Sequence, residues 1–315
     1  MNLTQLTVFK EVMETGSISQ AAKQLGRTQP AISLAIRNLE QALGLPLFER
    51  RGRRLVPVPE AQYLLAEATS ILDRTATVTQ TMQSLRAAQS GALNIAVMPG
   101  PSAYIFPKFI SENVEKHTRF QMTLASRSSP QIRELASSQS IDFGFADFDT
   151  PKEAEPRYLS EIVSADCFCA VHRDHALAGQ SGIKIEDLAG QDVGMLGGDH
   201  PLNRRLSLAF QGAGVGLSSY ISSQFFLPLM PFIALGHCVA VVDPLTAVTE
   251  QELGISGGQI VFVPFQAPVR YEYAILTPTF RPASQLATRI RTRWKETLLD
   301  MLNDMNARPA LGAAA

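Results

Sequence analysis

The first 43 residues carry apolar side chains at the spacing of amphipathic helices, in three groups separated by Gly16 and Gly26. Ser17 and Gln20 form a capping box at the start of the second predicted helix, and Thr28 caps the third. Two short helices joined by a tight turn, the second of them longer, predict a helix-turn-helix. The residues predicted to face inward are Leu3, Leu6, Phe9, Val12, Met13, Ile18, Ala21, Ala22, Leu25, Ala31, Ile32, Ala35, Ile36, Leu39 and Leu43.

The polar side chains of the third predicted helix include Gln29, Ser33 and Arg37, which lie four residues apart and share its solvent face. Gln and Arg side chains can each bind a base edge through two hydrogen bonds, and a Ser hydroxyl can bind a phosphate. Pro30 fits the first turn of this helix, where its missing N–H costs no hydrogen bond. A merely solvated helix face has the same stripe, so the stripe alone leaves both interpretations open.

A small hairpin is predicted over residues 47–56, with Gly52 at its tip and four arginines around it. These arginines repel one another unless a polyanion neutralises them. The first 59 residues hold eight basic and four acidic side chains, a net charge of +4, although the whole chain has a net charge of −1. A helix-turn-helix followed by an arginine-rich wing predicts a DNA-binding domain over residues 1–59. The expected DNA contacts are Ser17, Thr28, Gln29, Pro30, Ser33, Arg37, Arg50, Arg51, Arg53 and Arg54.

Residues 60–91 carry an apolar stripe whose steps alternate between four and three residues. This is the a/d pattern of a coiled-coil seam, which one helix cannot bury alone. We therefore expect a dimer through a linker helix, although a helix packed on its own domain has the same pattern. Gln89, Ser90 and Gly91 are expected to form a hinge. The expected seam residues are Leu64, Ala68, Ile71, Val78, Met82 and Leu85, with Thr75 as the polar position.

From residue 92 the pattern changes to short apolar strands that alternate with helices. Strands separated by helices predict a parallel sheet with right-handed crossovers, and hence an α/β domain over residues 92–306. The first predicted series has strands at 93–98, 120–125 and 141–146, with helices at 108–116 and 131–138. The second has strands at 166–171, 193–196, 239–242 and 271–277, before a helix at 284–306. The tail, 307–315, is expected to be disordered.

Ligands of such sheets lie beyond the carboxyl ends of the strands, near the N-termini of the following helices. Four strand-to-helix turns meet this description, although each alone is more often an ordinary capped helix start. Helix N-termini favour anions, so a small carboxylate is the expected effector. The expected contact residues in these turns are Gly100, Pro101, Ser102, Arg127, Ser128, Ser129 (as an N-cap), Gly198, Asp199, Phe225 and Phe226.

The chemical class of the effector stays open at this point. Asp147, at the end of an apolar strand, can pair with an amine or a guanidinium, and together with Arg127 it suits an amino-acid-derived ligand that carries both charges. Phe225, Phe226 and Tyr104 favour an aromatic or apolar carboxylic acid instead. A third interpretation makes Asp147 a solvated carboxylate or one that hydrogen-bonds across a hinge.

The sequence gives little indication of catalytic, metal-binding or membrane-spanning segments. The 45% hydrophobic and 18% charged residues are typical of a globular protein, and the three cysteines form no CxxC pair. The sequence contains no GxSxG or phosphate-binding glycine loop, and His172-Arg173-Asp174-His175 has no further ligand cluster, so no metal or cofactor is expected. The longest apolar run, 225–235, contains two prolines and is too short for a membrane span. Because the N-terminus also lacks signal-peptide features, we expect a cytoplasmic protein.

Several stretches of the first 59 residues match one known pattern: Phe9, Gly16-Ser17, Thr28-Gln29-Pro30-Ala31-Ile32-Ser33 and Leu47-Phe48-Glu49-Arg50. Together they resemble the N-terminal signature of LysR-type transcriptional regulators. Arg50-Arg51-Gly52 and the wing exit at 57–61 are similar to the branch that governs opine and lysine metabolism. Leu34 departs from the pattern, since the family often has a polar or basic residue there.

The resemblance implies an effector domain of two α/β subdomains linked by two crossing strands, like a periplasmic binding protein. Subdomain I would comprise residues 92–162 and 268–306, and subdomain II residues 163–267. The implied function is a ligand-responsive, non-enzymatic transcription factor that binds double-stranded DNA at an interrupted palindromic operator, as a dimer or a tetramer. Its other implied partners are a small-molecule effector and RNA polymerase, but no membrane. The alternative is an enzyme or solute-binding protein with an accessory DNA-binding head.

Overall fold

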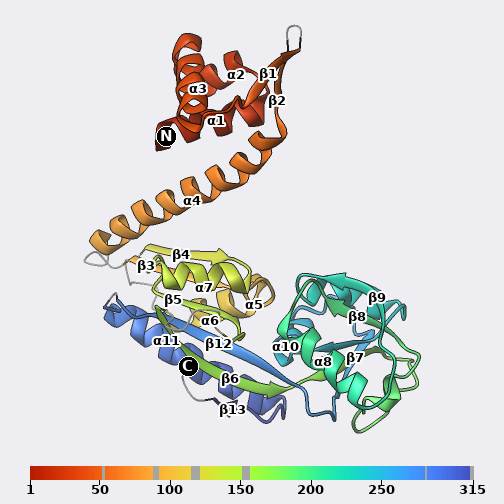
Figure 1. Ribbon diagram of the computed structural model, residues 1–315. Coiled ribbons are helices and arrows are strands. Elements are labelled where there is room, and N and C mark those ends of the chain that lie inside the picture. Colours follow the sequence, from red (N-terminus) through yellow and green to blue (C-terminus); the bar gives the residue numbers. More distant parts are fainter. Residues whose placement is uncertain (52–53, 88–91, 115–120, 151–156, 281, 313–315) are drawn as a thin grey trace. The chain divides into compact units, whose positions relative to one another are not determined.

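The computed structural model describes residues 1–51, 54–87, 92–114, 121–150, 157–280 and 282–312 (Figure 1). The chain forms two compact units, Met1–Gln83 and Ser84–Ala315. Among the helices of the described ranges, none is long and apolar enough to cross a lipid bilayer.

Three helices of the N-terminal unit pack around one small core: α1 (Leu3–Thr15), α2 (Ile18–Gln24) and α3 (Gln29–Leu43). Phe9 and Leu39 are completely buried, because the apolar spacing of each helix brings such side chains to one face. α1 and α3 end at Gly16 and Gly44, whose φ angles of 64° and 74° are left-handed and favour glycine. These elements confirm the predicted helix-turn-helix. Two residues that we expected to face inward, Leu3 and Ala31, are exposed.

A hairpin follows α3 and confirms the predicted wing. Its strands β1 (Phe48–Arg51) and β2 (Arg54–Pro57) pair antiparallel. The Glu40 carboxylate on α3 accepts the backbone N–H groups of Leu47 at 2.8 Å and Phe48 at 3.3 Å. The Phe48 ring also lies 5.9 Å from that of Phe9. These contacts fix the start of the hairpin to the helices.

Helix α4 (Pro59–Ala87) continues from the hairpin and carries the expected seam residues. Ala61 and Ala68 are completely buried within the N-terminal core. Ala68, which we expected to contact a partner helix, is therefore covered by its own chain, because the first turns of α4 pack on the helix-turn-helix. Ile71 and Val78 remain 39% and 53% exposed. The expected hinge at 89–91 lies outside the described residues.

The first subdomain of the C-terminal unit is built on a six-stranded sheet with the order β13-β6-β12-β5-β3-β4. β3, β4 and β5 run parallel, whereas β12 is antiparallel to both β5 and β6. Trp294 of α11 is completely buried, with its ring 4.7 Å from Phe106 and 5.0 Å from Phe145. The elements are β3 (Ala92–Val97), α5 (Pro99–Ala103), α6 (Ile105–Asn113), β4 (Gln121–Ser126), α7 (Ser129–Ser137), β5 (Phe143–Asp147), β6 (Tyr158–Asp166), β12 (Arg270–Pro278), α11 (Gln285–Asp304) and β13 (Ala310–Leu311).

The second subdomain combines a three-stranded antiparallel sheet, β10-β7-β11, with the parallel pair β8-β9. Val239 bridges to Val193 and so joins the two groups of strands. The elements are β7 (Phe168–His172), a 3-10 turn (Glu186–Leu188), β8 (Asp192–Leu196), α8 (Pro201–Gly212), β9 (Ser218–Ser223), a 3-10 turn (Leu227–Leu229), α9 (Met230–Ala234), β10 (Ala240–Val242), α10 (Pro244–Leu253) and β11 (Ile260–Pro264).

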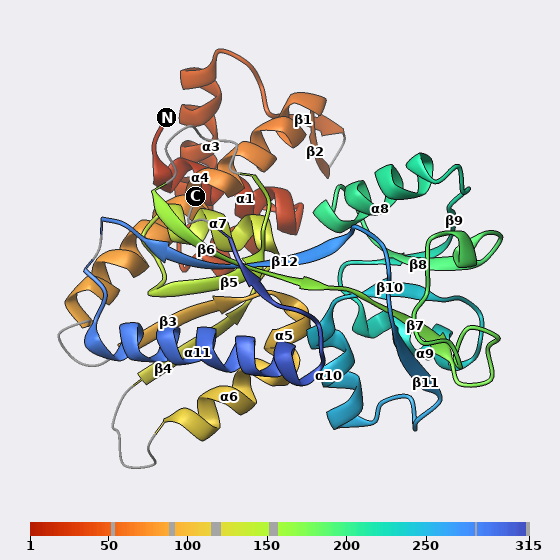
Figure 2. The same ribbon diagram turned by 90° about the horizontal axis from the view of Figure 1, so that it is seen from below.

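Two long strands, β6 and β12, run side by side from one subdomain toward the other (Figures 1 and 2). They pair over their whole length, from Tyr158 with Pro278 to Asp166 with Arg270. The six-stranded sheet is mixed and the three-stranded sheet is antiparallel, whereas we predicted parallel sheets. The six-stranded sheet is mixed because the chain leaves the first subdomain along β6 and returns along β12 in the opposite direction. The chain crosses between the subdomains at residues 167 and 265–269, so that β6 extends past the expected boundary at 162.

The tail is ordered through residue 312, unlike the expected disorder of 307–315. Ala310 and Leu311 form β13, which pairs with Ser164 and Val163 of β6. Ala307 is completely buried and its carbonyl accepts the N–H of Asp166. The tail is ordered because it completes the edge of the sheet at β6. Residues 313–315 lie outside the described ranges.

Candidate functional site

The outward face of α3 presents the polar stripe seen in the sequence. Gln29, Pro30 and Arg37 are exposed and Ser33 is half-buried. Arg37 Nε donates to the Ser33 carbonyl at 3.4 Å, so the Arg37 side chain lies along the helix surface. The second helix of a helix-turn-helix presents its N-terminal residues to the major groove, which gives this stripe the composition and position of a DNA-reading surface.

The starts of α2 and α3, at Ser17 and Thr28, were also expected to contact DNA. Ser17 is the N-cap of α2, and its hydroxyl accepts the Gln20 N–H at 3.4 Å. Thr28 occupies the N-cap position of α3, but its side chain makes no capping hydrogen bond. Its exposed hydroxyl therefore stands at a positive helix end, where a phosphate oxygen is favoured.

The wing brings basic residues together at its outer end. In the register of β1 and β2, Arg51 pairs with Arg54 and Arg50 pairs with Leu55. Like charges opposite each other on paired strands destabilise a hairpin unless a counter-charge is present. Arg53, also expected to contact DNA, lies outside the described residues.

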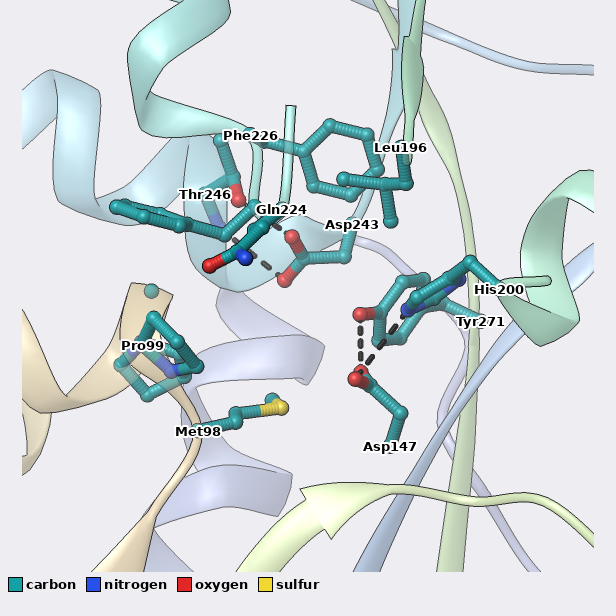
Figure 3. A pocket seen from close by; sticks show the side chains of 13 residues that line it. Met98, Pro99, Asp147, Leu196, His200, Gln224, Phe226, Asp243, Thr246 and Tyr271 are labelled. Carbon is teal, nitrogen blue, oxygen red and sulfur yellow. Dashed lines mark hydrogen bonds and ion pairs between the residues drawn. The ribbon is translucent and has the colours of Figure 1, made fainter. Parts of the chain in front are cut away.

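A pocket of about 330 Å³ lies between the two subdomains of the C-terminal unit (Figure 3). Its residues come from the turn after β3, the ends of β5 and β8, the N-terminal ends of α8 and α10, the segment after β9, and β12. Ligands of α/β sheets bind at this place, beyond the carboxyl ends of the strands. The lining residues are Met98, Pro99, Gly100, Pro101, Asp147, Leu196, His200, Gln224, Phe225, Phe226, Asp243, Thr246 and Tyr271.

The Asp147 carboxylate has three side-chain partners. Ser129 Oγ donates to Asp147 Oδ2 at 2.7 Å. The Tyr271 hydroxyl donates to Oδ1, and His200 Nε2 lies 3.2 Å from Oδ2 (Figure 3). Burial raises the pKa of Asp147, but the hydrogen bonds and charge of these partners outweigh burial, so that its pKa lies below the ordinary value. Asp147 therefore faces the pocket as an ionised carboxylate.

His200 contacts Asp147 as a hydrogen-bond donor. It is the N-cap of α8, where its Nδ1 accepts the Leu202 N–H at 3.2 Å. Its other ring nitrogen, Nε2, donates to Asp147 Oδ2 at 3.2 Å. His200 thus both caps α8 and orients the Asp147 carboxylate.

Asp243 is the second carboxylate of the pocket and is buried to 5% exposure. Its Oδ1 accepts the Tyr273 hydroxyl at 2.7 Å and the Thr246 N–H at 3.2 Å, and its Oδ2 accepts the Thr246 hydroxyl. Burial outweighs these bonds and raises the pKa of Asp243. The pKa of Asp147 is therefore lowered, whereas the pKa of Asp243 is raised.

Helix α8 makes three polar contacts from the second subdomain to the first. His200 binds Asp147, Arg204 Nη2 lies 2.7 Å from Asp149 Oδ1, and Arg205 pairs with Glu272. Arg205 Nη1 also donates to the Arg270 carbonyl of β12 at 3.0 Å. The first two turns of α8 thus connect the pocket wall with the strand that links the subdomains.

The structure brings some of the expected effector contacts to the pocket and not others. Gly100, Pro101, Asp147, Phe225 and Phe226 line it. Ser129 lies directly behind Asp147 and is not the N-cap of α7, as we had expected, because Ser128 occupies that position. The expected contacts that are not among the lining residues are Ser102, Arg127, Ser128, Gly198 and Asp199.

Those outlying residues have other bonding partners. Ser102 Oγ donates to the Pro99 carbonyl at 2.8 Å, and Arg127 Nη1 donates to the Ser126 carbonyl at 2.8 Å. Asp199, with its side chain 84% exposed, pairs with Arg204. Each sits in the correct turn, but its side chain belongs to the surface of that turn and not to the pocket.

The polar lining residues that were not among the expected contacts are His200, Gln224, Asp243, Thr246 and Tyr271. His200 directly follows the predicted Gly198-Asp199 turn. Asp243 ends a predicted strand and precedes Pro244, which is the pattern of a helix N-cap and was a usable signal. Tyr271 lies inside a predicted strand, and only the crossing of that strand between the subdomains brings it to the pocket.

The other titratable groups do not form a second reactive centre in the described residues. Cys167, Cys169 and Cys238 are free and buried. Burial raises the pKa of Cys169 to about 12 and of Cys238 to about 11, and also that of Cys167, so all three remain thiols at neutral pH. Within the described ranges, no group of three His, Cys, Asp or Glu residues is placed to hold a metal ion.

Comparison with known proteins agrees with both units. The model of bacterial regulatory helix-turn-helix proteins of the LysR family matches residues 3–62. The model of the LysR substrate-binding domain matches residues 86–298. The second match places the pocket residues inside an effector-binding domain.

Individual relatives and structures are similar over most or part of the chain. Regulatory protein NocR of Agrobacterium tumefaciens (strain T37) is 29% identical over 301 residues, which are 95% of this chain and 96% of NocR. The octopine catabolism/uptake operon regulatory protein OccR of Rhizobium meliloti is 32% identical over 193 residues, 61% of this chain and 64% of OccR. The crystal structure of full-length CbnR with its target DNA has the same fold, with a TM-score of 0.64 and 21% identity over 96% of this chain and 100% of CbnR.

These findings remove the alternative of an enzyme or transport protein with an accessory head, because the matched relatives are regulators throughout their length. The chain is a ligand-responsive regulator whose partners are DNA, further copies of itself and a small-molecule effector. With its helix-turn-helix and its substrate-binding domain both matched, the chain belongs to the LysR family of bacterial transcriptional regulators.

Proposed function

We propose that the pocket between the subdomains binds a small amino-acid-derived effector, and that this binding changes how the N-terminal domain binds or bends its operator. The observation that carries the proposal is the ionised carboxylate of Asp147, which is held by three hydrogen-bond donors and faces the pocket. No Lys or Arg is present among the 13 described residues that line the pocket.

A buried carboxylate without a counter-charge is costly, since the transfer of an ion from water is repaid only by an opposite charge or by hydrogen bonds. Asp147 has the hydrogen bonds, but no Lys or Arg among the lining residues pairs with it. An ammonium or guanidinium group on the effector would supply that charge. Asp243, on the opposite subdomain, offers a second acceptor to the same group or to a second donor.

The rest of the lining suits the remainder of such a molecule. The expected effector carboxylate would meet the Gln224 amide and the backbone of Gly100, where a Cβ atom would have open space. OccR is named for an octopine operon, and opines are amino-acid derivatives that carry both charges.

Phe225 and Phe226 favour a second candidate, an aromatic carboxylic acid. Phe226 is 3% exposed and its ring lies 6.4 Å from that of Tyr271, so one wall of the pocket is aromatic. An aromatic acid would leave Asp147 without a counter-charge, which is why we place it second.

For the N-terminal domain, we assign the DNA contacts to the α3 stripe, the helix starts at Ser17 and Thr28, and the wing arginines. The support is the exposure of Gln29, Pro30 and Arg37 and the like-charge pairing in the wing. We assign residues 1–59 to DNA binding, 60–91 to dimerisation and the residues from 92 onward to effector binding. A regulator that binds an operator acts where the chromosome is, so we place its activity in the cytoplasm.

The proposal is tested by thermal unfolding of the full-length protein with octopine, arginine and ornithine, with Nα-acetylcitrulline and Nα,Nδ-diacetylornithine, which keep a carboxylate but carry no cationic group, and with benzoate. A ligand that binds only the folded state raises the apparent melting temperature as its concentration exceeds the Kd. We expect a cationic amino-acid derivative to stabilise the wild type and to lose this effect in Asp147→Asn, while Asp149→Asn, outside the pocket lining, retains it.

Two results would contradict the proposal. Stabilisation by benzoate alone, undiminished in Asp147→Asn, would establish the aromatic-acid alternative. Equal stabilisation of the wild type and Asp147→Asn by the cationic ligands would place their binding outside this pocket.

A further inference from the structure

Leu34 is a large apolar residue on the DNA-reading side of α3. It is 53% exposed, whereas Ile32 and Leu39 of the same helix are completely buried. Pro30 lies four residues before it and Arg37 three residues after it, so the three share one exposed helix face. Leu34 therefore presents an apolar surface among the polar groups of the recognition stripe.

Nothing in the packing of the N-terminal unit explains this leucine. Its helix buries the opposite face, through Ile32, Ile36 and Leu39, in the core with α1 and α2. Leu34 itself is absent from that core and from the partly buried residues that pack on it. Leu34 is 53% exposed and does not pack on this core, so the exposed part of its apolar surface is available to what α3 binds.

We propose that Leu34 reads thymine in the operator through the C5-methyl group. The second helix of a helix-turn-helix lies in the major groove and presents its N-terminal half to the base edges. A leucine side chain has no donor or acceptor, so it cannot pair with the polar edges of adenine, guanine or cytosine, or with a phosphate. Thymine is the base that offers an apolar group in that groove.

The neighbours of Leu34 support the assignment. Gln29 and Arg37 are suited to adenine and guanine, so Leu34 adds the remaining kind of contact to the same face. Pro30, exposed on the preceding turn, extends the apolar surface. The head has a net charge of +4, which supplies sequence-independent attraction to DNA, and Leu34 would then contribute discrimination and not general affinity.

The experiment removes one methyl group at a time from DNA. The full-length protein first selects its preferred duplex from a random library. Each thymine of that duplex is then replaced by deoxyuridine, which lacks only the C5-methyl, and affinities are measured for the wild type, Leu34→Ala and Leu3→Ala. Leu3, 44% exposed on α1, is the matched control for a leucine removed from the surface of the head.

We expect one thymine position in each half-site at which deoxyuridine weakens wild-type binding about fourfold, the change expected for burial of one methyl group. Leu34→Ala should bind the thymine duplex about fourfold more weakly and be indifferent to deoxyuridine at that position, whereas Leu3→Ala should behave as the wild type. Because Leu34 is exposed and alanine favours helices, the melting temperature of Leu34→Ala should match that of the wild type.

Two outcomes would overturn the assignment. If no deoxyuridine replacement changes wild-type affinity, or if the same replacement weakens the wild type and Leu34→Ala equally, another residue or none reads the methyl group. If Leu34→Ala instead changes the oligomeric state of the protein without DNA, Leu34 is a contact between copies of the chain and not a base reader.

Discussion

Tyr271 and Tyr273 are two residues apart on β12, and their hydroxyl groups donate to two different carboxylates, Asp147 and Asp243. Their rings lie 4.9 Å apart. Asp147 ends β5 of the first subdomain, and Asp243 follows β10 of the second. One strand therefore holds the acidic groups of both subdomains at one pocket, and a relative movement of the subdomains has to rearrange at least one of these bonds.

The two tyrosines should differ in what their hydroxyl groups do. Tyr271→Phe removes a donor to Asp147 and should weaken effector binding several-fold, because the carboxylate is less firmly oriented. Tyr273→Phe removes a donor to Asp243 and should act mainly on stability. Each change should cost about 1–3 kcal/mol in the free energy of unfolding, since a buried acceptor loses a partner. Urea unfolding and calorimetric titration measure the two effects separately.

A larger loss of effector affinity in Tyr273→Phe than in Tyr271→Phe would show that Asp243, and not Asp147, is the principal ligand contact.

The pH dependence of stability should have opposite signs for the two carboxylates. Asp147 has a lowered pKa, so its contribution to stability is full above the ordinary aspartate pKa of about 4 and is lost as the pH falls through the folded-state pKa. Asp243 has a raised pKa, so its buried charge opposes folding above that range, and protonation on acidification relieves the cost.

The comparison of Asp147→Asn with Asp243→Asn measures these signs. Between pH 6 and pH 3, the urea midpoint of Asp147→Asn should fall less than that of the wild type, and the midpoint of Asp243→Asn should fall more. If the urea midpoints of both variants fall less than the wild-type midpoint, or both fall more, the two carboxylates have pKa values shifted in the same direction. That result would contradict the opposite shifts that we describe.

Ser128 and Ser129 provide a matched pair for the role of the turn before α7. Ser129 Oγ donates to Asp147 and accepts the Asp147 N–H at 3.0 Å, whereas Ser128 is the exposed N-cap. Ser128→Ala should cost about 0.5–2 kcal/mol of stability and leave effector affinity unchanged. Ser129→Ala should lower effector affinity as well, because Asp147 loses two of its bonds. An effect on affinity in Ser128→Ala alone would reverse these roles.

The sequence predicted local structure well and the assembly of the pocket only in part. Gly100 and Pro101 were found because a glycine and a proline after an apolar strand mark a turn into a helix, and this signal is local. Tyr271 was missed because its place depends on β12 crossing from one subdomain to the other, which local spacing does not encode. The register of β6 and β12, and with it β13, depends on contacts more than 100 residues apart along the chain.

The burial of Ala68 likewise could not be predicted from local spacing. The heptad spacing of α4 predicts an apolar stripe, but spacing does not show whether an apolar residue faces its own domain or a partner. The first turns of α4 pack on the helix-turn-helix and bury Ala68, whereas Ile71 and Val78 stay exposed.

The exposed part of the seam can therefore be tested directly. Ile71→Glu combined with Val78→Glu should place like charges across the two-fold contact and dissociate the dimer, with a loss of operator affinity. Ala66→Glu combined with Ala76→Glu, at exposed positions outside the seam, should leave the dimer intact. Light scattering coupled to size exclusion measures both. A dimer that survives the first pair of changes would have its contact elsewhere.

The most direct test of the central claim is the response of operator binding to effector in the wild type and in Asp147→Asn. Full-length protein is titrated onto its selected duplex, with and without the cationic amino-acid derivative that stabilises the wild type, and affinity and DNA bend are recorded. We expect the effector to change one or both in the wild type and in Asp149→Asn, but not in Asp147→Asn, whose binding to DNA without effector should be normal. An effector response in Asp147→Asn with the wild-type midpoint and amplitude would contradict the claim that this carboxylate recognises the effector.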